Sequence, residues 1–137
     1  MPSAAWAPRE RRSAMTDSLH LAYGRHVLAD IADTSADVLN DGEALARALT
    51  EAALAEGTTV LGTIRHAFEP AGVTVLLLLA ESHVSLHTYP GEGRAFFDAF
   101  TCGVRCEPIN IFRRFVDASS VGSYRIIHCE RGDAGKR

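Results

Sequence analysis

The sequence has few of the features that mark secreted, membrane or nucleic-acid-binding proteins. It contains only three cysteines, which are too few for a disulfide framework and cannot all pair with one another. We therefore expect reduced thiols and a cytoplasmic location. The longest apolar run, residues 73–80, is far shorter than the about 20 residues that span a bilayer. The net charge of −3 provides no broad basic surface. We therefore expect neither nucleic acid nor a membrane as a partner.

The chain does contain enough apolar residues for one folded domain. Apolar residues make up 47% of its 137 residues, and this length suits a single domain. Residues 1–17 are small, polar and charged, and we expect them to form a disordered N-terminal extension. Residues 133–137 are expected to be a loose tail. The domain is therefore placed at residues 18–132.

Within this domain the hydrophobic pattern alternates between strands and helices. It predicts strands over residues 20–30, 58–64, 73–79, 83–88, 94–102 and 123–129. Helices are predicted over residues 42–56, capped by Asn40 or Asp41, and from Pro108 onward. The apolar continuity of residues 73–79 predicts a buried strand. The fold class is α/β (α+β): a two-layer sandwich of a mostly antiparallel sheet with two helices on one face.

One segment concentrates reactive side chains: Ser82, His83, His87 and Cys102 lie within about twenty residues. His83 and His87 are four positions apart in a predicted strand, so about 13 Å separates their imidazoles. Two groups that far apart cannot share a zinc ion, and we expect no metal site. Ser82 does not lie in a G-x-S-x-G turn, so nothing supports a serine-hydrolase triad. On composition alone, each of these residues is better explained by packing or hydrogen bonding.

The order of residues in this segment resembles the signature of prokaryotic S-adenosylmethionine decarboxylase proenzymes. The resemblance is carried by the sequence ESHVSLHTYP at residues 81–90 and by DAFTCG at residues 98–103. Further matches are GRH at residues 24–26 and ERG at residues 130–132. Together they span residues 22–132. The resemblance implies a self-cleaving, pyruvoyl-dependent decarboxylase that acts on a small molecule.

The resemblance also implies roles for single residues. The chain would cut itself between Glu81 and Ser82, and Ser82 would become a pyruvoyl group. His87 would assist this cleavage, Thr74 would support it with its hydroxyl, and Cys102 would donate the proton to the product. The pyruvoyl ketone would form a Schiff base with the substrate amine and accept the electrons of decarboxylation, as pyridoxal phosphate does elsewhere. Neither pyridoxal phosphate nor a metal is then required.

Substrate recognition departs from the usual family pattern. Phe68 matches an aromatic residue that packs on the adenine ring, but Tyr89 stands where the family has tryptophan. Gly91 stands where a glutamate binds the ribose hydroxyls, and Glu92 would replace it only if the turn shifts. The first expectation is S-adenosylmethionine as the substrate, with a product that supplies the aminopropyl group of spermidine.

Two alternatives remain open. One is a decarboxylase of arginine or ornithine, with Glu92 or Asp98 meeting the distal cation of the substrate. The other is a homologue that does not process itself and acts as a binding or regulatory subunit. In either decarboxylase reading, the resemblance implies a homodimer of cleaved protomers with active sites near the interface.

The spacing of Ser82 and His87 poses a geometric problem. Residues five positions apart on an ideal strand face opposite sides of the sheet. The sequence therefore predicts either a bend of the strand near Ser82 or a turn immediately before His83.

Overall fold

A computed structural model describes residues 22–102 and 105–132 of the chain. The extension expected at residues 1–17 and the tail expected at residues 133–137 lie outside the described residues. The elements, in chain order, are β1 (Tyr23–Ile31), α1 (Ala36–Asn40), α2 (Gly42–Ala55), β2 (Val60–Ala67), β3 (Val73–Leu79), β4 (Ser82–Tyr89), the 3-10 turn η1 (Pro90–Glu92), β5 (Arg94–Cys102), α3 (Pro108–Ala118) and β6 (Tyr124–Gly132).

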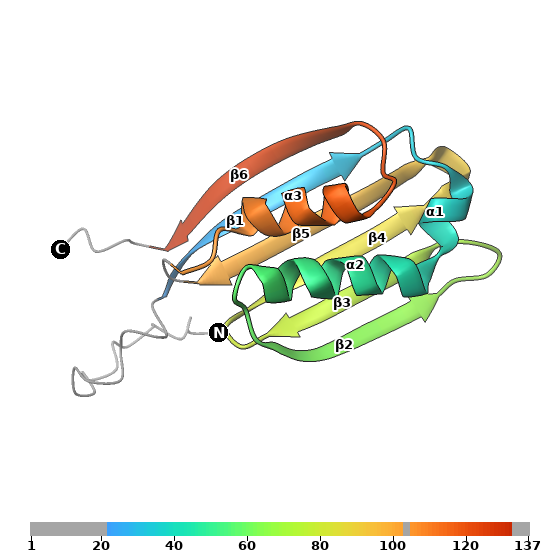
Figure 1. Ribbon diagram of the computed structural model, residues 1–137. Helices are drawn as coiled ribbons and strands as arrows, with labels where there is room; N and C mark the ends of the chain where they lie inside the picture. The colour runs from blue at the N-terminus through green and yellow to red at the C-terminus, as the bar shows by residue number, and fades with distance from the viewer. Residues whose placement is uncertain (1–21, 103–104, 133–137) are drawn as a thin grey trace, which may run out of the picture.

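The strands form one antiparallel sheet in the order β2-β3-β4-β5-β1-β6. Strand β1 therefore lies between β5 and β6, which come much later in the sequence. Helices α2 and α3 lie side by side on one face of the sheet (Figure 1). The predicted two-layer architecture is confirmed. Helix α1, of five residues, was not predicted, because it is too short to show a helical period.

The core lies between the two long helices and the sheet. Helix α3 begins at Pro108, as predicted, and buries Ile111, Phe112 and Phe115 completely. Phe97 of β5 meets this stripe, with its ring 4.9 Å from the Phe112 ring and 5.9 Å from the Phe115 ring. Aromatic pairs at these distances stabilise a core beyond the area that they bury. None of the helices in the described residues has the length and apolar character that crossing a membrane requires.

The prediction that β3 is a buried strand is only half correct. Its residues alternate, with Val75 and Leu77 buried against the helices while Leu76 is 40% and Leu78 59% exposed. The helices cover one face of the sheet only, so every second side chain of the apolar run points away from the core. We call the uncovered side of the sheet the open face. Its exposed apolar residues are Leu28, Ile64, Leu76, Leu78, Phe96 and Ile127.

Two neighbouring side chains hold the start of α2 in place. Asp41 is the N-cap, since its carboxylate accepts a hydrogen bond from the Ala44 amide at 3.0 Å. Asn40 does not cap the helix. Its side-chain oxygen instead accepts from the Gly72 amide at 3.0 Å, which ties the helix to the turn before β3. This contact holds one wall of the pocket described below.

Candidate active site

Strand β4 carries two of the predicted catalytic residues, Ser82 and His87, and fixes the distance between them. It pairs with β3 and β5 in an unbroken register. Ser82 opens the strand opposite Leu79, directly after the two-residue turn of Ala80 and Glu81, whereas His87 pairs with Thr74 near the other end. The register of β4 does not shift near Ser82, and the turn of Ala80 and Glu81 ends before it, so Ser82 is the first residue of the strand and not part of the turn. Five residues of extended chain separate Ser82 and His87 by about 16 Å.

The predicted site residues consequently fall into two groups at opposite ends of the sheet. We call Glu81, Ser82 and Cys102 the tip group, because they lie at or beside the β3–β4 turn. We call Phe68, Thr74, His87, Tyr89 and Glu92 the pocket group, because they line one pocket. Within one chain the structure brings together the members of each group, but it does not bring the two groups together.

In the tip group, the thiol of Cys102 lies close to the residue that precedes the predicted cut. Burial, followed by the negative charge of Glu81, raises the pKa of the Cys102 thiol above its ordinary value. The thiol therefore keeps its proton at neutral pH. This state suits a group that must deliver a proton.

The pocket group surrounds a hollow of about 590 Å³, a size typical of small-molecule sites. Thr74 Oγ1 and His87 Nδ1 are in hydrogen-bond contact at 2.9 Å, so the threonine hydroxyl fixes the plane of the imidazole. Phe68 and Tyr89, each about half exposed, offer aromatic faces to the hollow. A Cβ atom added at Gly91 would meet nothing within 4 Å, so open space remains where the family has glutamate.

Backbone contacts around Thr88 hold the walls of this pocket. The Val73 amide donates to Thr88 Oγ1 at 2.8 Å, and Thr88 Oγ1 donates to the Leu39 carbonyl at 2.8 Å. The turn that carries Phe68 is closed by its amide, which donates to the Gly72 carbonyl at 2.8 Å. Because Thr88 is buried, its two hydrogen bonds are shielded from water, which strengthens them.

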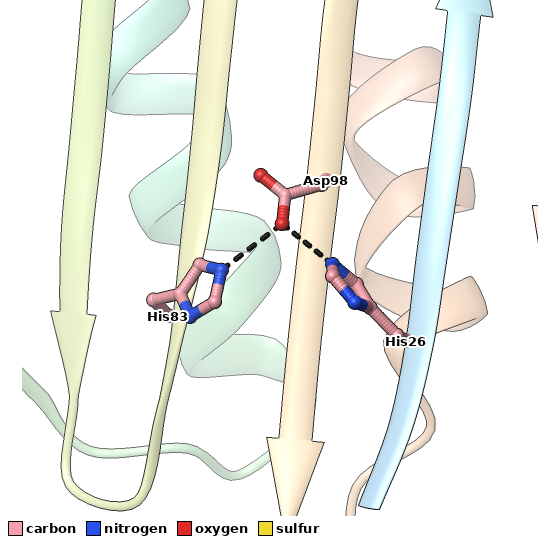
Figure 2. A group of neighbouring side chains, drawn as sticks. All are labelled: His26, His83 and Asp98. Atoms are coloured by element: carbon pink, nitrogen blue, oxygen red, sulfur yellow. Dashed lines mark hydrogen bonds and ion pairs between the residues drawn. The ribbon is translucent and has the colours of Figure 1, made fainter. Parts of the chain in front are cut away.

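A third cluster was not anticipated from the sequence. His26, His83 and Asp98 converge on the open face from β1, β4 and β5 (Figure 2). Asp98 Oδ2 accepts from His26 Nε2 at 2.6 Å and from His83 Nε2 at 3.0 Å, while Ser85 donates to Asp98 Oδ1. Each residue lies in a motif that the resemblance had singled out. Their meeting depends on the insertion of β1 beside β5, which no local pattern reveals.

The hydrogen bonds in this cluster keep Asp98 ionised. Burial by itself would raise the pKa of the Asp98 carboxyl. Hydrogen bonds from Ser85, His26 and His83, together with the charge of His83, more than offset burial and hold that pKa below its ordinary value. The carboxylate only accepts hydrogen bonds in this state, so both imidazoles donate from Nε2.

The likeness to known proteins identifies the family. A sequence model described as S-adenosylmethionine decarboxylase matches residues 25–132. The chain belongs to this family. A solved structure of the adenosylmethionine decarboxylase from Aquifex aeolicus VF5 superposes with a TM-score of 0.76 and 28% identity, over 85% of this chain and 96% of that one.

Two curated relatives of the family show how far the similarity extends. The S-adenosylmethionine decarboxylase proenzyme of Moorella thermoacetica is 35% identical over 81% of this chain and 89% of its own length. The proenzyme of the same name from Brevibacillus brevis is 49% identical over 63% of this chain. That match spans 65% of the Brevibacillus protein.

Neutralising Glu81 should lower the pKa of Cys102, because the Glu81 charge disfavours the thiolate. The change is Glu81→Gln in an uncut Ser82→Ala background with the exposed Cys129 replaced by serine. The measurement is the pH dependence of Cys102 alkylation by iodoacetamide, followed by mass spectrometry. We expect the midpoint to move to lower pH.

The matched control is Glu51→Gln, an exposed glutamate on α2, which should leave the midpoint in place. Cys106 is an internal reference, because burial, followed by the charge of Glu56, raises its pKa to about 11. An unchanged or raised midpoint for Cys102 in Glu81→Gln would contradict the assignment.

Proposed function

We propose that the protein is a pyruvoyl-dependent S-adenosylmethionine decarboxylase that cuts its own chain between Glu81 and Ser82. The observation that carries this proposal is the position of Ser82, which follows a tight turn beside a thiol that keeps its proton. The relatives named proenzymes support it, since that name denotes a precursor that must mature. The domain would span residues 18–132 before cleavage. The product would supply aminopropyl groups for spermidine in the cytoplasm.

The proposed cleavage uses only the chain and one water molecule. Ser82 Oγ attacks the carbonyl carbon of Glu81, and the acyl group shifts from nitrogen to oxygen to give an ester. Removal of the Ser82 α-proton by a base then expels the Glu81 carboxylate and leaves dehydroalanine. Water adds to this residue and releases ammonia, so that a ketone caps the second fragment. His87 is the proposed base, and Thr74 holds its ring.

The residues around the tip suit the group that cleavage would create. A pyruvoyl group supplies an electron sink for the carbanion that decarboxylation leaves. Cys102 holds a proton near that position and would deliver it to the α-carbon of the product. Phe68 and Tyr89 would bind the adenine ring between aromatic faces. Glu92, the one acidic residue lining the pocket in the described part of the chain, would accept hydrogen bonds from the ribose.

The two groups must meet for this chemistry, and one chain keeps them about 16 Å apart. A second copy of the chain removes the difficulty. In the dimer that we propose, the open faces of two protomers meet. A two-fold axis lies between these faces, at right angles to the strands, so the strands of the partner run in the opposite direction. The tip group of each protomer then lies opposite the pocket group of the other. We therefore place two composite active sites in a homodimer.

The open face has the character that such a dimer requires. Ile64 and Leu78 are 68% and 59% exposed, and Phe96 and Ile127 are 41% and 49% exposed. Exposed apolar side chains gathered on one uncovered face of a sheet mark a surface that another surface covers. Burial of this patch would stabilise the same pairing that completes the site.

A second candidate is the decarboxylation of arginine or ornithine. The open space at Gly91 favours it, because no acid stands there to hold a ribose. Glu92 would then meet the distal cation of the amino acid. Asp98 suits this role less well, since its carboxylate already accepts three hydrogen bonds and lies outside the pocket lining.

Purified wild-type protein should consist of two fragments, residues 1–81 and residues 82–137. Intact mass spectrometry is the measurement. The second fragment should be lighter by one ammonia than simple hydrolysis would leave, because the serine amine is lost. Ser82→Ala should remain one chain, and Ser120→Ala, an exposed serine after α3, should still be cut. An uncut wild-type chain would overturn the proposal in favour of a binding or regulatory subunit.

Composite sites predict that one defective chain can rescue another. His87→Ala lacks the base of the pocket group, and Ser82→Ala lacks the hydroxyl of the tip group, so each alone should stay uncut. When the two are co-expressed with different tags, the His87→Ala chain should be cut inside mixed dimers. The matched control pairs the His87→Ala chain with a chain that carries both Ser82→Ala and His87→Ala, because this partner has no His87 to supply. Mixed dimers without a cut would show that the site is not shared.

Reductive trapping separates the two candidate substrates. The cleaved enzyme is incubated with cyanoborohydride and with S-adenosylmethionine, arginine or ornithine, and the fragment of residues 82–137 is weighed. We expect an adduct with S-adenosylmethionine. Glu92→Gln should raise KM for it about tenfold or more, as loss of a charged hydrogen bond does, whereas Glu69→Gln on the adjacent turn should not. An adduct with an amino acid alone would establish the second candidate.

A further inference from the structure

The histidine–aspartate cluster on the open face is held by the sheet itself. His26 and His83 both pair with Phe100, from opposite sides, and Asp98 lies two residues earlier on the same strand and face. The Phe100 ring contacts both imidazoles, with ring centres 5.6 Å from His26 and 6.2 Å from His83. Side chains mounted on paired strands and packed against one ring have little freedom to move apart.

The polar atoms of this cluster converge on one point. His26 Nε2, His83 Nε2 and Asp98 Oδ2 all lie within 4.8 Å of one another (Figure 2). The carboxylate oxygen is 2.6 Å from one nitrogen and 3.0 Å from the other. Ligands of a tetrahedral ion with bonds near 2 Å are about 3.3 Å apart. Small side-chain adjustments therefore bring the three atoms to ligand positions.

We propose that His26, His83 and Asp98 bind a divalent transition-metal ion, with zinc as the best fit. Two imidazole nitrogens and one carboxylate oxygen suit zinc and its neighbours, whereas magnesium and calcium prefer oxygen ligands. The ion takes the place of the hydrogen on each Nε2, and each neutral imidazole then carries its one hydrogen on Nδ1 instead. Three protein ligands leave one tetrahedral position for water. The proposal is independent of the decarboxylase function, because all three ligands come from one chain.

Ser85 gives the cluster the outer support that metal sites have. It donates a hydrogen bond to Asp98 Oδ1, which orients the carboxylate and leaves Oδ2 directed at the two histidines. Groups that hold a ligand in this way contribute about tenfold to a hundredfold in metal affinity. In a single chain the site is also reachable, since the side chains of His26 and Asp98 are 17% and 23% exposed and that of His83 is 46% exposed. An ion can therefore enter on the His83 side before two open faces pair.

The test measures metal directly on the full, untagged chain. Wild type and the uncut Ser82→Ala variant are dialysed against Zn²⁺ and analysed by mass spectrometry for metal content. Both should bind one ion per chain, so failure of self-cleavage leaves this result unaffected. Co²⁺ is the spectroscopic probe, and its visible bands should show tetrahedral nitrogen and oxygen coordination. Excess Zn²⁺ should displace it.

Four variants and one control assign the ligands. His26→Ala, His83→Ala and Asp98→Asn should each lose the ion, and Ser85→Ala should bind it about tenfold to a hundredfold more weakly. His128→Ala is the matched control, because this histidine lies on β6 outside the cluster and should leave binding intact. Circular dichroism verifies that each variant is folded. Spectra of ¹⁵N-histidine in the unaltered chain should show Zn²⁺ shifting the Nε2 signals of His26 and His83.

Three results would overturn the assignment. The first is wild-type protein that binds no Zn²⁺ or Co²⁺ and leaves the histidine signals in place, which would reduce the cluster to hydrogen bonding. The second is binding that persists in all three ligand variants. The third is a thiolate-to-cobalt absorption band, which would show that a cysteine holds the ion instead.

Discussion

Strand β4 is hydrogen-bonded to β3 from Ser82 to His87 and to β5 from His83 to Tyr89, and this double pairing is the constraint on which the site depends. An extended strand with both edges occupied cannot shorten or curl without breaking its ladder. The residue proposed to be cut and the histidine proposed to assist therefore stay at opposite ends. The sheet that makes each half of the site rigid also prevents one chain from closing it.

The one-sided placement of the helices gives the two faces of the sheet different tasks. The covered face holds the core, in which Phe97, Phe112 and Phe115 pack as a group. The open face carries apolar side chains beside polar clusters. Successive side chains of a strand point to opposite faces, so the same strands supply both the core and the open face. A single fold thus offers a surface for a second chain, the two groups of the proposed catalytic site and the proposed metal ligands.

Much of the fold could be predicted from the sequence because capping residues, proline and glycine mark where its helices begin and end. Pro108 opens α3, Asp41 caps α2, and Gly57, with φ of 80°, adopts the left-handed conformation just past its end. The resemblance supplied the site residues, but neither pattern nor resemblance showed how they divide between two ends of the sheet. That division follows from the extended length of β4, whereas the meeting of His26 with Asp98 follows from strand order. Strand order depends on contacts between distant residues, which local periodicity does not record.

The insertion of β1 between β5 and β6 would hold the molecule together after the proposed cut. A cut between Glu81 and Ser82 assigns β1, β2 and β3 to one piece and β4, β5 and β6 to the other. In the strand order, the pieces then share three ladders, β3 with β4, β5 with β1, and β1 with β6. Because these ladders alternate between the two pieces, the proposed cut would leave the pieces held together by strand pairing, with no covalent bond between them.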